Sequence, residues 1–212
     1  MDFSAIARPA FGKLAQHVEA KSPGVFTGKT AARRAMMFKE ARELLTALPK
    51  PGESVHGIMT GAYDLMVLLV ALLDLHPAPC RRLRIATLCY NRRNAVELLG
   101  LLESAKIGGL TLLASDFFRG HNKEVDEWFR GELAAFPSSR TAAGRSHCKV
   151  VCFDFADGAG LVLEGSANLR TNSNREQIAL INDRPLHDFH ATWIDDMVNR
   201  DEGDQSGDRT TG

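Results

Sequence analysis

The chain has 212 residues, of which 44% are hydrophobic and 25% charged, values typical of a globular protein with a sizeable core. Its 26 basic and 26 acidic residues balance, so net charge gives no argument for a polyanionic partner, although a balanced total can hide a local basic face.

Residues 1–50 are predicted to form a helical extension, with apolar spacing typical of helices over Phe11–Ala20 and Thr30–Leu48. Between them, Gly24–Thr30 resembles a phosphate-binding loop, but it has three residues between its glycines where the motif has four, and no strand precedes it. We therefore expect a capped helix start there. The proline-rich stretch 49–52 is a plausible domain boundary.

The location expected for the chain is the reducing cytoplasm. Residues 1–10 lack the basic start and apolar stretch of a secretory signal, and none of the four cysteines forms a C-x-x-C pair. The most apolar run, Leu65–Leu73, is too short to cross a bilayer and lies between Asp64 and Asp74, so no membrane span is expected.

Residues 51–200 alternate between strand-like and helix-like patterns, which predicts an α/β domain whose mixed, largely parallel sheet is flanked by helices. Its last helix is expected at Pro185–Asn199, and the polar residues 201–212 are expected to be disordered. The other expected strands are Ser54–Thr60, Leu83–Tyr90, Leu110–Ala114, Cys148–Phe155, Gly160–Glu164 and Gln177–Ile181, and the other expected helices are Tyr63–Leu75, Asn91–Ser104 and Lys123–Phe136.

The segment Ser146–Gln177 carries the chemistry. His147 and Lys149 lie two residues apart on a predicted strand, so both side chains point to one face while apolar neighbours point to the other. Such a polar pair is costly in a buried sheet unless it faces a cavity or a partner. A lone histidine is more often a structural residue with its hydrogen bonds satisfied. The other motif residues of this segment argue against that interpretation.

This segment resembles the phospholipase D superfamily, which is marked by H-x-K-x4-D followed by G-S-x-N. The gap between the two elements is longer here, which we interpret as a longer hairpin turn over Phe155–Gly160. The matching residues are His147, Lys149 and Asp154 in the first element, Gly165, Ser166 and Asn168 in the second, and Asn174-Arg175-Glu176 as the Asn-x-Glu that often follows.

The residue types suit displacement at a phosphodiester. A neutral histidine can attack phosphorus and form a phosphoenzyme, and a lysine supplies positive charge to the non-bridging oxygens. Ser166 and Asn168 can add neutral donors, and Glu176 can hold the imidazole in one tautomer. Asp154 lies an odd number of residues from His147, so we expect it on the other face, in the structural role that the resemblance implies.

No cofactor is expected. One histidine with a lysine and neutral amides is a poor metal-ligand set, and the resemblance likewise implies catalysis without a divalent ion.

The chain carries a single H-x-K motif of this kind, whereas the superfamily opposes two across a twofold axis, one histidine attacking and the other protonating the leaving group. We therefore expect a homodimer joined through its active-site face, which brings together His147 of both copies. His121 and Lys123 repeat the spacing, but no G-S-x-N follows them, so they are expected at the surface.

The resemblance favours a nuclease acting on DNA or RNA, since single-motif members are similar to nucleases. A phospholipase or phosphatidyltransferase, and a silent DNA-binding or scaffold protein of the same fold, remain alternatives. The low aromatic content, 7%, argues against a reader of single strands by stacking. The residues that could contact a phosphate backbone are Arg92, Arg93, Arg145, Arg170, Asn174 and Arg175.

Overall fold

The computed structural model describes residues 36–43, 45, 47–61, 64–170 and 174–207. The predicted helix Phe11–Ala20 and the glycine-containing segment after it lie outside these residues. Residues 36–43 are helical, and Met37, Ala41 and Leu45 are buried in the main hydrophobic core. The described part of the N-terminal extension therefore packs on the same core as the rest of the chain.

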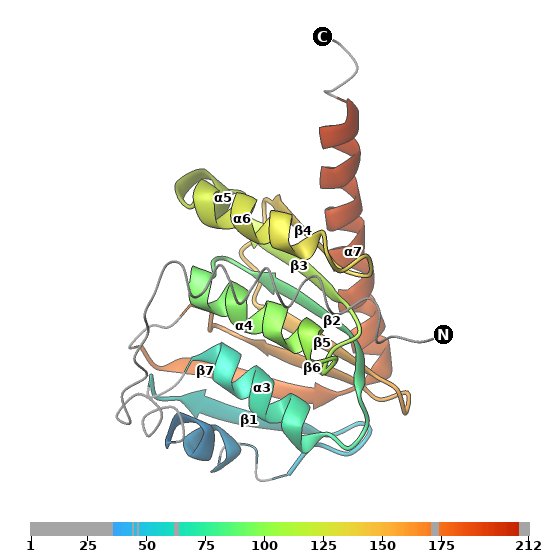
Figure 1. Cartoon of the computed structure of the whole chain (residues 1–212). Coiled ribbons are helices and arrows are strands. Elements are labelled where there is room, and N and C mark those ends of the chain that lie inside the picture. The colour runs from blue at the N-terminus through green and yellow to red at the C-terminus, as the bar shows by residue number, and fades with distance from the viewer. Residues whose placement is uncertain (1–35, 44, 46, 62–63, 171–173, 208–212) are drawn as a thin grey trace.

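A seven-stranded mixed sheet forms the centre of the molecule, with the strand order β1-β7-β6-β5-β2-β3-β4 (Figure 1). β2, β3 and β4 pair in parallel, whereas β1, β7, β6, β5 and β2 pair antiparallel in succession. The strands are β1 (Ser54–Met59), β2 (Cys80–Thr87), β3 (Leu110–Ser115), β4 (Arg140–Gly144), β5 (Val150–Phe155), β6 (Gly160–Gly165) and β7 (Glu176–Asn182).

Helices cover the two faces of the sheet unequally. α3, α4 and the α5–α6 pair pack over one face around the larger core, and the long α7 crosses the other face over a smaller core (Figure 1). The helices are α3 (Leu65–Leu75), α4 (Arg92–Glu103), α5 (Asp116–His121), α6 (Lys123–Leu133) and α7 (Arg184–Gly207).

The starts of α3 and α4 are fixed by side-chain caps at the same edge of the sheet. The Asp64 carboxylate accepts from the Val67 amide, and Asn91 and Asn94 form a reciprocal capping box. Both helices follow strands that end at this edge, so the caps place two loops there.

The predicted α/β class with a mixed sheet flanked by helices is confirmed, but parallel pairing is less extensive than expected. It is confined to β2, β3 and β4, because β5 and β6 form a hairpin inserted between β2 and β7, and β1 pairs with β7. Strand β4 and helix α5 were not predicted.

Helix α7 also continues past its predicted end at Asn199 to Gly207, through part of the segment expected to be disordered. Extending a formed helix is far easier than nucleating one, and the carboxylate of Asp201 is held by Arg119 at 2.9 Å. Residues 208–212 lie outside the described part. No helix within the described ranges is long and apolar enough to cross a membrane.

Candidate active site

The motif residues converge where β6 ends and β5 and β7 begin, at the edge where β2 also ends. The parallel strands β2 and β3 end at the same edge, which is where open α/β sheets commonly bind ligands. The register pairs Gly165 with Ile178 and Val150 with Glu164, and thereby brings three distant segments of the sequence together.

His147 and Lys149 lie next to one another in an extended stretch that precedes β5. The Lys149 Nζ is 3.0 Å from the His147 Nδ1 and donates to the His147 carbonyl oxygen at 2.7 Å. The strand begins only at Val150, so the pair is not inside the sheet as expected. His147 is exposed and Lys149 partly buried, which gives a substrate access to the imidazole.

Gly165 allows β6 and β7 to approach closely at the site. A Cβ at this position would lie 2.2 Å from the Gln177 carbonyl oxygen, so no other residue fits without movement of the backbone. The Gly165 amide donates to the Lys149 carbonyl at 3.3 Å. Glycine in the G-S-x-N element thus fixes the lysine-bearing segment beside the serine.

Ser166 is held from both sides by the start of β7. Its amide donates to the Gln177 carbonyl oxygen at 3.1 Å, and its Oγ accepts from the Gln177 amide at 3.1 Å. The same hydroxyl donates to the Glu176 carboxylate. The hydrogen bond of Glu176 that the described residues show is with Ser166, so the orienting role expected for it towards His147 stays a prediction.

Asn168 joins the motif loop to the end of β2. Its Oδ1 accepts from the Leu88 amide at 3.2 Å, while the buried Thr87 hydroxyl accepts from the Leu169 amide at 3.4 Å and donates to the Cys89 carbonyl at 3.1 Å. The amide oxygen of Asn168 is thus used in holding the loop. Its Nδ2 is the atom with which this side chain can donate to an anion.

The electrostatics of the site centre on Lys149. Partial burial lowers the pKa of its ammonium, and the neighbouring Cys89, Cys148 and Glu176 oppose that shift. Burial likewise raises the pKa of the Cys89 thiol, against the effect of Arg170 and Lys149. Burial disfavours the charged form of Lys149, so a phosphate anion bound beside it would stabilise the protonated ammonium.

Asp154 lies at the other end of β5, and its odd spacing from His147 predicted only that it would lie on the other face of the strand. Burial opposes its charge, but hydrogen bonds from Arg184 at 3.1 Å and Arg81 at 3.2 Å outweigh burial and lower its pKa. The carboxylate ties β5 to α7 and to the start of β2. This geometry agrees with a structural role remote from the chemistry.

The candidate phosphate-binding residues fall into two groups. Arg92 stacks over the Trp128 ring at 4.1 Å and Arg93 pairs with Glu97 at 3.1 Å, so both are engaged on the helical layer. The others are exposed at or near the motif edge, where a small hollow is lined by residues that include Asn168, Glu176, Arg170 and Asn174. Exposed members of this group are Arg145, Arg170, Asn174 and Arg175.

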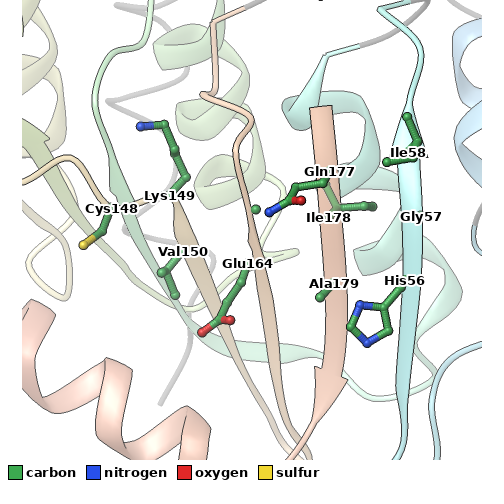
Figure 2. A pocket seen from close by; sticks show the side chains of 11 residues that line it. His56, Gly57, Ile58, Cys148, Lys149, Val150, Glu164, Gln177, Ile178 and Ala179 are labelled. Atoms are coloured by element: carbon green, nitrogen blue, oxygen red, sulfur yellow. The ribbon is translucent and has the colours of Figure 1, made fainter. Parts of the chain in front are cut away.

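A groove of about 690 Å³ opens beside the motif on the α7 side of the sheet (Figure 2). Figure 2 shows the Lys149 side chain at one end, with Glu164, Ala179 and His56 in a row across neighbouring strands. The eleven residues lining it are His56, Gly57, Ile58, Cys148, Lys149, Val150, Glu164, Gly165, Gln177, Ile178 and Ala179.

Sequence reasoning missed three parts of this site. Thr87 and Cys89 contribute from the end of β2, and His56 contributes from β1 across the groove. The rule that ligands bind at the ends of parallel strands could have singled out Thr87. His56 became a neighbour through the pairing of β1 with β7, for which the sequence carries no local signal.

At one edge of the mixed sheet the structure gathers the H-x-K pair, the G-S-x-N loop and a glutamate, which are the motif residues that resemble the phospholipase D superfamily. Among solved structures, the chain is similar to Nuc from Salmonella typhimurium, described as a phospholipase D family member. The identity is 15% and the TM-score 0.49, over 69% of this chain and 94% of Nuc.

Two further structures show the same degree of similarity. NucT from Helicobacter pylori is 18% identical with a TM-score of 0.49, over 69% of this chain and 97% of its own. Polyphosphate kinase from Porphyromonas gingivalis is 14% identical with a TM-score of 0.49, over 88% of this chain, which spans only 29% of the kinase. At such identities and scores, activity does not transfer from these proteins to this chain.

No protein-family model matches the sequence. No curated protein matches it significantly either.

Proposed function

We propose that the chain is a metal-independent phosphodiesterase, most specifically a nuclease, that cleaves through a phosphohistidine on His147 in a site completed by a second subunit. The observation that carries the proposal is the cluster itself. An exposed imidazole lies 3.0 Å from a lysine ammonium, and the serine and asparagine of the G-S-x-N loop are fixed beside them by backbone hydrogen bonds.

In the first half-reaction, the His147 Nε2 lone pair attacks phosphorus and forms a P–N bond. The P–O bond to the leaving nucleoside breaks, and a second histidine donates a proton to that oxygen. Lys149 and the Ser166 hydroxyl neutralise charge on the non-bridging oxygens. In the second half-reaction, water attacks phosphorus, the P–N bond breaks, and the second histidine takes the proton of the water.

The hydrogen bond from Lys149 decides which tautomer the free imidazole has. A protonated lysine can only donate, so the His147 Nδ1 accepts and the proton of the neutral ring lies on Nε2. Attack requires a free Nε2 lone pair, which this tautomer lacks, and the leaving-group acid must be a protonated imidazolium that becomes neutral when it gives up its proton. A phosphate that draws Lys149 towards its own oxygens would release Nδ1 and allow the nucleophilic tautomer.

One His147 cannot be a neutral nucleophile and a protonated acid at once, which supports a site shared by two copies. With a twofold axis near the motif, one imidazole attacks while its partner protonates the leaving oxygen. The two identical residues then differ in protonation, because the attacking ring is neutral and the donating ring is an imidazolium.

Nucleic acid is the substrate class that the surface favours. Arg145, Arg170 and Arg175 are exposed at or near the motif edge, where they can follow a phosphate backbone beyond the scissile bond.

The test is degradation of plasmid and single-stranded DNA and of RNA in excess chelator, comparing the protein with His147→Ala. We expect chelator-resistant cleavage that falls by at least about a thousandfold in the variant, because the nucleophile is lost. His121→Ala is the matched control, since His121 also precedes x-Lys but lies on α5, and it should cleave normally.

Cleavage that disappears with chelator, or that survives in His147→Ala, would contradict the proposal. Headgroup release from phospholipid micelles without any cleavage of nucleic acid would identify a lipid enzyme. DNA binding without cleavage would identify a silent binder.

A further inference from the structure

The groove beside the motif lies on a part of the sheet that α7 leaves open. Helix α7 packs mainly on β2 to β6, and on the same face of β7 and β1 the side chains of Gln177, His56 and Ile58 are exposed. The volume of the groove, about 690 Å³, lies within the range of about 300–1,000 Å³ that is typical of small-ligand sites. The groove is therefore large enough for a nucleobase of a substrate.

The groove has an apolar floor and a polar rim. The floor is formed by the small or apolar side chains of Val150 on β5 and Ala179 on β7 (Figure 2). A planar ring with apolar faces and hydrogen-bonding edges suits such a lining, in which few polar groups fix the orientation of the ligand. The polar side chains that line the groove beside the H-x-K segment are His56, Glu164 and Gln177.

Lys149 connects the groove to the candidate active site. It lies at one end of the groove, with Glu164 further along (Figure 2). The strand register places Glu164 opposite Val150, the residue that follows Lys149. A nucleotide whose phosphate is held by Lys149 could therefore extend its base along the groove towards Glu164.

Helix α7 holds the Glu164 carboxylate in one orientation. The Trp193 indole N–H donates to the His190 Nδ1 at 2.9 Å, so the proton of the neutral His190 ring lies on Nε2. That Nε2 donates to Glu164 Oε1 at 2.6 Å. A carboxylate accepts at both oxygens, so Glu164 keeps accepting capacity for an occupant of the groove.

We propose that the groove binds the nucleobase next to the scissile phosphate and that Glu164 makes it selective for guanine. Guanine presents two adjacent donors, N1–H and N2–H₂, which one carboxylate can accept as a pair. The other bases place a ring acceptor or a carbonyl beside their donor, and a carboxylate disfavours that arrangement. The inference rests on the proposed function and deepens it, because it names the preferred substrate.

Nucleotide binding tests the subsite without catalysis. Calorimetry in chelator compares guanosine, inosine and adenosine 5′-monophosphates, and we expect guanosine monophosphate to bind about tenfold more tightly than adenosine monophosphate. Inosine monophosphate lacks the N2 amino group and should lie between them. In Glu164→Gln the preference should disappear or move towards adenine, because glutamine pairs with adenine N6 and N7 and still accepts from His190.

Two further variants complete the test. Glu127→Gln, exposed on α6, is the matched control and should keep the guanine preference. Ala179→Leu fills the floor of the groove and should weaken binding of all three nucleotides by about tenfold or more, with thermal unfolding as the check that it is folded. If Glu164→Gln does not fold, the comparison of guanosine with inosine in the native protein and Ala179→Leu still decide.

Three results would overturn the inference. They are equal affinities for the three nucleotides in the native protein, a guanine preference that Glu164→Gln leaves intact, and nucleotide affinities that Ala179→Leu leaves unchanged. In the last case, sedimentation of Ala179→Leu as a monomer from a dimeric native protein would assign the groove to a second copy.

The subsite and the proposed function can fail separately, because binding requires no cleavage. Guanine-selective binding by a protein that never cleaves a phosphodiester would reject the function and keep the subsite. Chelator-resistant cleavage of oligonucleotides that differ only in the base beside the cleaved bond, at equal rates, would reject the subsite and keep the function.

Discussion

The two halves of the sheet are built differently. In the parallel half, every residue of β3 is buried, helices cover both faces, and Arg84 and Arg140 are paired with Asp195 of α7. In the antiparallel half, β1 and β7 alternate between buried and exposed positions, and the H-x-K and G-S-x-N segments meet at its edge.

The parallel half mainly provides stability, and the antiparallel half carries the residues of the candidate active site. Continuous burial leaves the parallel half few polar groups that a substrate could reach, whereas the antiparallel half brings loops from β5, β6 and β7 together at one edge. Substitutions at that edge should therefore affect activity, and matched substitutions elsewhere should affect stability alone or nothing.

The largest effect is expected for Lys149→Ala, with a loss of about a thousandfold in kcat, because a charge aimed at the non-bridging oxygens is removed. Lys123→Ala, exposed on α6, is the control and should be silent. Both are measured as cleavage rates in chelator.

The pH dependence of the cleavage rate tests whether the charge of Lys149 is required. Burial lowers the pKa of Lys149, so its charge is lost below the usual lysine value of about 10.4 as pH rises. The alkaline limb of the rate profile should fall below that value and move upward in Lys149→Arg. An alkaline limb that does not respond to the arginine would exclude Lys149 as the titrating group.

Gly165→Ala should destabilise the edge of the sheet at the site and abolish most of the activity. Its Cβ would lie 2.2 Å from a carbonyl oxygen, which we expect to cost about 2–3 kcal/mol of unfolding free energy and most of the activity. Gly100→Ala on α4 meets nothing within 4 Å and should stabilise by about 0.5–1 kcal/mol. Denaturant titration measures both, and equal effects would remove the distinction between the two positions.

Thr87→Val compares one buried threonine with another. The Thr87 hydroxyl holds the Asn168 loop, so its loss should cost about 1–2 kcal/mol and lower kcat about tenfold. The buried Thr141 hydroxyl on β4 has no hydrogen-bond partner among the described residues, so Thr141→Val should be neutral or stabilising, with native activity. An active, fully stable Thr87→Val would show that the β2 end does not position the loop.

The smallest effect is expected for Asp154→Asn, about 1 kcal/mol of stability with activity retained, since its arginine partners are about half exposed. The folded-state pKa lies below its ordinary value of 3.8, so the contribution is present above that pH and lost as pH falls through the folded pKa. The difference between the two proteins in urea should accordingly shrink below about pH 4.

The sequence predicted the elements with strong periodicity and the motif residues, for identifiable reasons. Asn91 was expected to cap a helix and does, and Asp154 was expected on the other strand face from His147 and has the parity of Cys152, on the α7 side. Strand β4 was missed because its sequence, Arg-Thr-Ala-Ala-Gly, has little β-propensity and forms a strand by pairing with β3.

Contacts between residues far apart in the sequence could not be predicted. The antiparallel position of β1 beside β7 brings His56 to the groove, and the contact of Thr87 with Leu169 joins residues far apart in the sequence. The strand expected to contain His147 and Lys149 starts only at Val150, although the Lys149 carbonyl still accepts from the amide of Gly165 at the end of β6.

The most direct test of the central claim is to trap the covalent intermediate. A short oligonucleotide with a labelled scissile phosphate is mixed with the protein in chelator, quenched with alkali, and the protein is analysed by mass spectrometry. We expect an acid-labile, alkali-stable phosphoramidate on His147, absent from His147→Ala and present in His121→Ala. Cleavage in chelator with the phosphate on another residue, or with no adduct in a burst-phase experiment, would contradict it.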